Sequence, residues 1–224
     1  MVGLYSGLTT IGITGTIGSG KSTVGTILKE LSIPVIDSDE IVHNLLATSA
    51  EVQDLVVERF GPGVIISKPG SSAHQIDRKA LGRIIFKDPA GRADLEKILH
   101  PRVRDAFRRQ LEQFGKDPSI KLVGCLVPLL FEAGLRSEYD QTWAVVTDDT
   151  VLKDRLKKRE GFSLLELEQR LAAQWPQEKK SALADKVINN SGDLEETRKQ
   201  VLDLVNQLLT VQTAAPPASS PDGK

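Results

Sequence analysis

The sequence predicts a three-layer α/β fold built on a five-stranded parallel sheet. At residues 10–14, the β-branched run TIGIT leads into a glycine-rich turn and then into helical spacing of apolar residues at 21–31. A second short apolar strand at 33–36 is followed by helical spacing at 38–47. Such alternation of strand and helix is typical of a parallel sheet that carries helices on its faces.

Length and composition indicate one globular folding unit. The 224 residues are 40% hydrophobic and 26% charged, which excludes a largely disordered chain. The formal charge of −1 gives no reason to expect a nucleic-acid groove or an anionic membrane surface as partner. We find no basic start of a targeting segment and no window near about 18 apolar residues. We therefore expect a cytoplasmic protein, and nothing in the sequence indicates an obligate protein partner.

The middle of the chain changes from alternating elements to helical segments. We expect helices at 52–60, 78–86 and 102–114, and we expect Pro101 to end one helix, since proline lacks the amide hydrogen that continues it. No convincing core strand lies in this stretch. Residues of about 50–115 therefore form a helical insertion in the predicted fold.

The sheet resumes after the insertion. The near-continuous apolar run at 121–127 predicts a buried strand, and further strands are expected at 142–147 and 186–188. A long charged helical region at 151–181 separates these last two strands, and a final helix is expected at 194–209.

The predicted domain covers residues 10–210. Residues 1–9 precede it as an extension, and residues 211–224 are expected to be a disordered tail because they are rich in proline, serine and alanine. The single cysteine, Cys125, lies in an apolar run, so we expect it to be buried.

The turn after the first strand carries the strongest functional signal. The segment GTIGSGKS matches G-x-x-x-x-G-K-[ST], the P-loop motif, through Gly15, Gly20, Lys21 and Ser22. Its backbone amides and the following helix amino terminus would bind the phosphates of a nucleoside triphosphate, which we take to be ATP. Lys21 would bridge the β and γ phosphates, and the Ser22 hydroxyl would bind Mg²⁺. The nucleotide-binding residues in this prediction are Gly15, Gly18, Ser19, Gly20, Lys21, Ser22 and Thr23.

A P-loop does not by itself decide between a GTPase, a motor and a small-molecule kinase. The N-K-x-D motif with which common GTPases read their base is absent from the sequence. At this point an ordered series of motifs becomes informative: ITGTIGSGKSTV, VIDSDEIVH, QIDRKALGRIIF, LEKILHPRVR, VPLLFEAG, RLKKREG and ADKVINNSG. In this order they resemble the dephospho-coenzyme A kinase family over nearly the whole chain.

The resemblance implies an activity and a lid. Members of the family transfer the ATP γ-phosphoryl group to the ribose 3′-hydroxyl of dephospho-CoA, so the insertion at 50–115 would bind that substrate. Residues 150–180 would form the lid, whose Arg155 and Arg159 would stabilise the transferring phosphoryl group. A solvated helix remains an alternative for both arginines. Arg170 and Gln174 also match the family series.

Acidic residues after the second strand are candidates for acceptor binding. The resemblance makes Asp39 the group that accepts the hydroxyl proton and orients the attacking oxygen, while Asp37 would support substrate or metal. A structural alternative remains open: Asp37 with Glu40 matches a helix cap, and Asp39 suits the first turn of a helix.

Basic residues in LEKILHPRVR are candidates for the phosphates of the acceptor. Arg102 and Arg104 could pair with phosphate through their guanidinium groups, and His100 lies beside them. His100 could also be only a boundary residue, and the arginines only exposed side chains.

The sequence departs from a common metal-binding pattern and leaves other functions open. No carboxylate stands at Leu126 or Val127, where many P-loop proteins carry one, and Glu132 lies five residues past Val127. Thr16 and Ser38 replace the glycine and alanine common in the family. A kinase for another small hydroxyl substrate and a nucleotide-dependent switch without turnover remain alternatives.

Overall fold

The computed structural model describes residues 7–66, 75–158 and 171–214, and the chain divides into two compact units. The first unit combines Met1–Val35 with Asp117–Lys224, and the second unit is Ile36–Lys116. The second unit therefore begins earlier than the helical insertion expected at about residue 50. Among the described residues, no helix is both long and apolar enough to cross a membrane.

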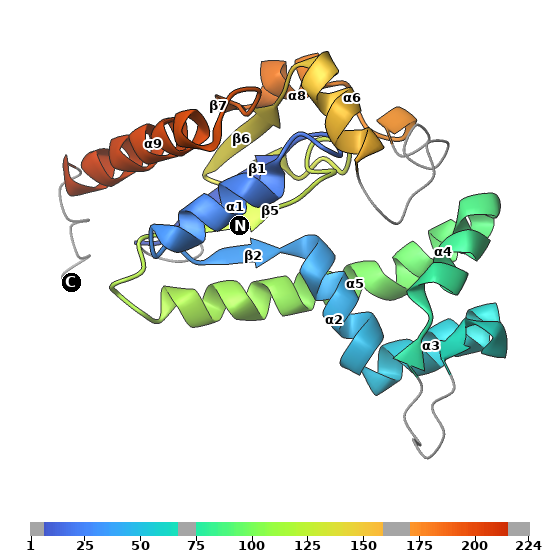
Figure 1. Cartoon of the computed structure of the whole chain (residues 1–224). Helices are drawn as coiled ribbons and strands as arrows, with labels where there is room; N and C mark the ends of the chain where they lie inside the picture. The colour runs from blue at the N-terminus through green and yellow to red at the C-terminus, as the bar shows by residue number, and fades with distance from the viewer. Residues whose placement is uncertain (1–6, 67–74, 159–170, 215–224) are drawn as a thin grey trace, which may run out of the picture. The chain divides into compact units, whose positions relative to one another are not determined.

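A five-stranded sheet with the order β2-β5-β1-β6-β7 forms the centre of the fold, and it confirms the predicted α/β class (Figure 1). The pairs β1–β5, β1–β6 and β6–β7 are parallel. The strands are β1 (Thr9–Thr14), β2 (Val35–Asp37), β5 (Leu122–Leu126), β6 (Gln141–Val146) and β7 (Lys186–Asn189). Residues of β1 and β5 are buried nearly throughout, as is usual for central strands of a parallel sheet.

The first unit packs helices against this sheet around one apolar cluster. Its described helices are α1 (Lys21–Glu30), η2 (Arg136–Glu138), α6 (Asp149–Lys157), α8 (Gln177–Leu183) and α9 (Leu194–Ala214). Ile13, Ile27 and Trp143 lie in the cluster and are at most 1% exposed. Cys125 is also fully buried, as expected, and burial raises the pKa of its thiol far above the ordinary range.

The second unit is mainly helical, as the sequence predicts. It contains α2 (Ser38–Thr48), α3 (Ala50–Phe60), η1 (Pro62–Val64), α4 (Arg78–Lys87) and α5 (Pro89–Gly115). Its core includes Leu46, Val52, Val56, Leu95 and Leu99. A two-stranded antiparallel sheet, β3 (Ile65–Ile66) with β4 (Gln75–Ile76), was not predicted, because strands of two residues carry no alternating pattern.

The prediction that Pro101 ends a helix is wrong. Pro101 lies inside α5, a helix of 27 residues. Proline in a helix interior costs about 3 kcal/mol or more. Leu95 and Leu99 before it, and Phe107 and Leu111 after it, are all buried, so burial on both sides of the proline offsets that cost.

Two other helices differ from the expected limits. Within the expected region 151–181, Pro176 precedes α8, and its extended backbone (φ −55°, ψ 153°) separates α8 from the residues before it. The last helix, α9, continues to Ala214 instead of ending at residue 209. The sequence TVQTA at 210–214 contains neither glycine nor proline, so nothing in it stops a helix before Pro216.

Candidate active site

The P-loop, residues 15–22, joins the carboxyl end of β1 to the amino end of α1 (Figure 1). In open parallel sheets, ligands bind at the carboxyl ends of the strands. Gly15 lies so close to β6 that a Cβ atom there would stand 2.4 Å from the Val145 carbonyl oxygen. Ser19 N–H donates to the Thr16 carbonyl (3.2 Å), which closes the turn. At Gly15 there is therefore room for backbone only.

The amino terminus of α1 is available for an anion. Its N-cap, Gly20, provides no capping side chain, and its first turn contains no acidic residue. By contrast, α2, α3, α4 and α5 each begin with a side chain that caps the helix. The N–H groups of a helix amino end and the helix dipole both favour phosphate there. The Lys21 ammonium adds positive charge beside it and donates to the Gly15 (2.8 Å) and Thr16 (3.1 Å) carbonyls.

The side chain of Asn190 is hydrogen-bonded to the backbone of the P-loop, a role that the motif series did not reveal. Its Nδ2 donates to the Ser19 carbonyl (2.8 Å), and its Oδ1 accepts from the Thr197 hydroxyl (2.9 Å). Only 4% of Asn190 is exposed. Because both ends of the amide are used, the Asn190 side chain has one orientation and holds the loop in one position.

Replacing Gly20 with alanine is expected to weaken MgATP binding at least tenfold. The Gly20 φ angle is +99°, and a Cβ atom there would lie 1.8 Å from Asn190 Nδ2. Strained backbone costs roughly 1–3 kcal/mol, and tenfold in affinity is about 1.4 kcal/mol. Titration calorimetry measures the change.

Gly82→Ala is the control, since a Cβ atom at Gly82 in α4 meets nothing within 4 Å. This variant should bind MgATP as the unaltered protein does. Equal MgATP affinity in Gly20→Ala and Gly82→Ala would show that the close contact between Gly20 and Asn190 is not needed for nucleotide binding.

Arg155 projects from α6, a helix that packs on the P-loop. A Cβ atom at Gly18 would lie 2.8 Å from Leu152 Cδ1 and 3.1 Å from Leu156 Cδ2, so these leucines cover the loop. Arg155 Nη2 donates to the Asn190 carbonyl (2.9 Å). Its Nη1 is buried and has no hydrogen-bond partner among the described residues. A phosphate oxygen would satisfy this nitrogen. The second predicted lid arginine, Arg159, lies outside the described residues.

A buried ion pair between Lys180 and Glu132 lies close to Thr14, the residue before the P-loop, and sequence patterns did not single out Lys180. Lys180 Nζ is 2.8 Å from Glu132 Oε1 and also donates to the Pro128 carbonyl (2.7 Å). Lys180 is completely buried. Burial lowers the pKa of its ammonium group, and the Glu132 carboxylate opposes that change.

In the second unit, the acidic candidates lie at the start of α2. Asp37 Oδ1 accepts from the Asp39 (2.9 Å) and Glu40 (3.4 Å) N–H groups, so the capping alternative for Asp37 is confirmed. The cap places Asp39 in the first turn, where its side chain is exposed. An exposed carboxylate at a helix amino terminus is accessible to a substrate hydroxyl.

The three candidates on α5 separate onto two faces. His100 and Arg104 are four residues apart, so they share one face, and both are exposed. Arg102 points elsewhere: it pairs with Glu51 of α3 and donates through Nη1 to the Ile98 carbonyl (2.7 Å). The structure therefore groups His100 with Arg104 and gives Arg102 other partners.

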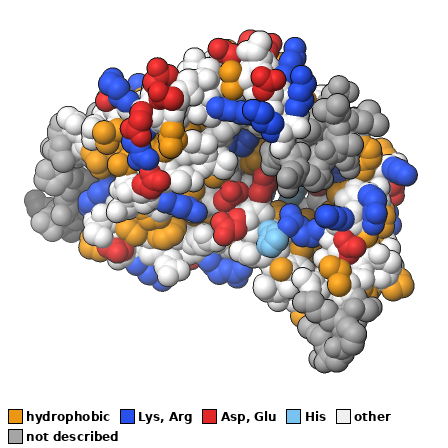
Figure 2. All heavy atoms as spheres, in the orientation of Figure 1, with side chains coloured by type: hydrophobic (Ala, Val, Ile, Leu, Met, Phe, Trp, Pro, Cys, Tyr) orange, Lys and Arg blue, Asp and Glu red, His pale blue; other side chains and the backbone are white. Residues whose placement is uncertain are grey.

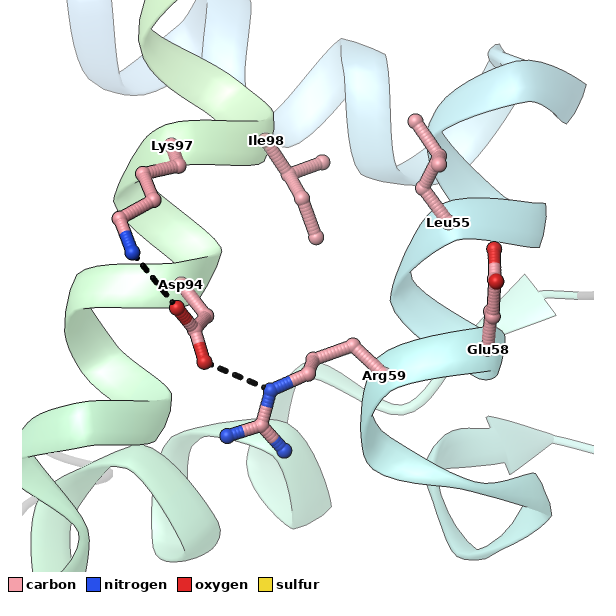
Figure 3. Close-up of a pocket in the computed structure, with 6 residues that line it drawn as sticks. All are labelled: Leu55, Glu58, Arg59, Asp94, Lys97 and Ile98. Carbon is pink, nitrogen blue, oxygen red and sulfur yellow. Dashed lines mark hydrogen bonds and ion pairs between the residues drawn. The ribbon is translucent and has the colours of Figure 1, made fainter.

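The second unit also contains a surface pocket of about 410 Å³ between α3 and α5 (Figure 3). Asp94 accepts there from Arg59 (2.8 Å) and from Lys97 (3.0 Å). The hydrogen bond from Arg59, followed by that from Lys97, lowers the pKa of Asp94. Because these charges neutralise one another and none belongs to a predicted site residue, we assign the pocket no role. More widely, acidic and basic side chains are interspersed on the visible surface (Figure 2).

The described residues offer oxygen donors for Mg²⁺ but no preformed cage. Among them, no group of three or more His, Cys, Asp or Glu side chains could hold a metal ion. Ser22 is exposed in the first turn of α1, the helix whose amino end no side chain caps. Mg²⁺ typically keeps several waters and is held by few protein ligands plus substrate phosphates. A single hydroxyl such as that of Ser22 is therefore enough protein for a Mg²⁺ ion that is held mainly by water and nucleotide phosphates.

Comparison with known proteins gives one consistent family. A family model described as dephospho-CoA kinase matches residues 9–196. A curated dephospho-CoA kinase of Symbiobacterium thermophilum is 45% identical over 193 residues, which are 85% of this chain and 77% of the relative. That of Geobacillus kaustophilus is 40% identical over 198 residues, which are 88% of this chain and 96% of the relative.

Solved structures are similar to this chain over most of its length. A crystal structure from Thermus thermophilus is 33% identical with a TM-score of 0.72, and covers 90% of this chain and 98% of that one. The dephospho-CoA kinase of Campylobacter jejuni is 25% identical with a TM-score of 0.66, and the same shares of the chains are covered.

Proposed function

Because the chain belongs to the dephospho-CoA kinase family, we propose that it transfers the γ-phosphoryl group of ATP to the ribose 3′-hydroxyl of dephospho-CoA. The products are CoA and ADP, and the reaction is the last step of CoA synthesis. The observation that carries this proposal is the P-loop at the carboxyl end of β1, fixed in shape by Asn190 and followed by a helix start that no side chain caps.

In this mechanism the first unit holds the nucleotide. Backbone amides of the P-loop and the amino end of α1 bind the phosphates, and Lys21 neutralises charge on the β and γ groups. Arg155 Nη1, which has no partner in the described part of the chain, binds an oxygen of the transferring group. Phosphoryl transfer requires little covalent chemistry from the protein, so position and charge provide most of the catalysis. Arg159 has the same proposed role.

The second unit holds the acceptor. Asp39 accepts the proton of the 3′-hydroxyl and orients its oxygen for attack, while Asp37 fixes the turn that carries Asp39. His100 and Arg104 bind phosphate groups of the acceptor from their shared face of α5. Arg102 would join them only after leaving Glu51.

Ser22 is the protein group that would ligate a Mg²⁺ ion bound together with ATP. Such an ion would supply positive charge to neutralise the phosphates. A requirement for Mg²⁺ and a cytoplasmic location remain predictions from the sequence.

An acceptor panel tests the proposed function. The protein is incubated with ATP and Mg²⁺ and, in separate reactions, with dephospho-CoA, nucleoside monophosphates or pantothenate, and ADP release is measured. Selective release with dephospho-CoA is the expected result. Release with another acceptor would identify a different kinase, and nucleotide binding without release in any reaction would identify a switch.

A further inference from the structure

The middle of the P-loop is held by a side chain from a distant part of the sequence. Ile17 N–H donates to Gln174 Oε1 at 2.8 Å, across 157 residues of sequence. The Ile17 side chain packs in a small apolar cluster with Leu152, Leu156 and Leu171. The backbone of Ile17 therefore contacts residue 174, and its side chain packs with residues 152, 156 and 171.

This hydrogen bond decides which way one amide of the loop points. An N–H group that donates to Gln174 is not available to a phosphate, so Gln174 is not part of the phosphate-binding set. Its effect is on the other amides, because fixing one peptide plane restricts its neighbours. Ordering a residue costs conformational entropy, and a loop ordered in advance avoids that cost when the nucleotide binds.

The residue that follows Gln174 is held by the buried ion pair of Glu132 and Lys180. The next residue, Trp175, donates its N–H to Glu132 Oε1 at 2.8 Å. Glu132 is paired with Lys180, and Lys180 donates to the Pro128 carbonyl.

The same set of hydrogen bonds also reaches Thr14, the residue directly before the P-loop. The Pro128 carbonyl also accepts from the hydroxyl of Thr14 (3.0 Å). The chain of contacts that leaves the loop at Ile17 thus closes at Thr14. A closed set of this kind fixes Gln174 relative to the loop on which it acts.

We propose that Gln174 is a positioning residue for ATP: it holds the Ile17 peptide so that the remaining P-loop amides are arranged for phosphate before the nucleotide binds. The proposal rests on the proposed function of the P-loop as the ATP site. Loss of the side-chain acceptor should therefore weaken nucleotide binding, with little effect on turnover once the site is saturated.

The test compares three full-length variants. Gln174→Met removes the acceptor and keeps the length of the side chain, whereas Gln174→Glu keeps an oxygen that can accept from Ile17 N–H. Gln53→Met is the matched control, because it removes a buried glutamine that donates to the Leu46 carbonyl (3.2 Å) in the second unit. Calorimetry gives the MgATP affinity, steady-state kinetics gives kcat and KM, and NMR hydrogen exchange follows the Ile17 amide.

We expect Gln174→Met to weaken MgATP binding by roughly fivefold to tenfold, the effect of one hydrogen bond, and to raise KM for ATP similarly. Its kcat at saturating ATP should stay within about threefold, and its Ile17 amide should exchange faster. In Gln174→Glu the slow exchange of this amide should be retained.

Two results would overturn the proposal. One is MgATP affinity in Gln174→Met within about twofold of the unaltered protein; the other is an equal loss in Gln53→Met, which would indicate a general loss of stability. Failure of the unaltered protein to bind MgATP would overturn the proposed function itself, so the two failures are distinguishable.

Discussion

Replacing Asp39 with asparagine should lower kcat by roughly a hundredfold or more while MgATP binding is unchanged. Asparagine keeps the shape of the side chain but cannot accept the proton of the 3′-hydroxyl. The backbone around it should be preserved, because the N–H groups of residues 39 and 40 would still donate to Asp37. Turnover with dephospho-CoA and calorimetry with MgATP measure the two effects separately.

Glu40→Gln is the matched control for this variant. Glu40 is the next residue in the first turn of α2, is exposed as Asp39 is, and loses the same charge in the variant. Its kcat should stay within about twofold, because we assign it no contact with substrate. If Asp39→Asn turns over as fast as Glu40→Gln, Asp39 has no part in the reaction.

Replacing Lys180 with methionine should lower the free energy of unfolding by about 3–5 kcal/mol, because it leaves the Glu132 carboxylate in a mostly buried position without its cation. Lys180 is completely buried, and the Glu132 side chain is 13% exposed. Oε2 of Glu132 already lacks a hydrogen-bond partner among the described residues, and Oε1 would keep only the Trp175 N–H. Denaturant unfolding measures the change.

A second substitution separates loss of pairing from loss of packing. In the double variant Glu132→Gln with Lys180→Met, the buried charge is gone, and the glutamine oxygen can still accept from Trp175 N–H. We expect this variant to recover at least about half of the lost stability, since removing both charges of a buried pair is far less costly than removing one. A double variant as unstable as Lys180→Met would show that the unpaired Glu132 charge does not cause the loss of stability in Lys180→Met.

The parts of the fold that could be predicted from sequence are those that local rules determine. The glycine spacing of GTIGSGKS specifies a tight turn between strand and helix, and β1 and α1 lie where the pattern placed them. Asp37 followed by Glu40 indicates a helix start, and α2 begins directly after Asp37. Pro101 misled the prediction because its local effect was outweighed by burial along the rest of α5.

The supports of the P-loop could not be predicted in this way. Asn190 meets Ser19 across 171 residues and Gln174 meets Ile17 across 157, and neither contact leaves a periodic trace in the sequence. Gln174 matched the family series without any indication of its partner. Lys180 lies in a short charged stretch that is typical of an exposed helix, although the folded chain buries it completely.

The reaction itself can be followed with ATP that carries isotopic label in its γ-phosphoryl group. After incubation with Mg²⁺ and dephospho-CoA, mass spectrometry and phosphorus NMR locate the label. We predict that it appears as a phosphomonoester on the ribose 3′-oxygen of the acceptor, in an amount equal to the ADP formed. Label found only in inorganic phosphate, or at any other position of the acceptor, would contradict the transfer proposed for this protein.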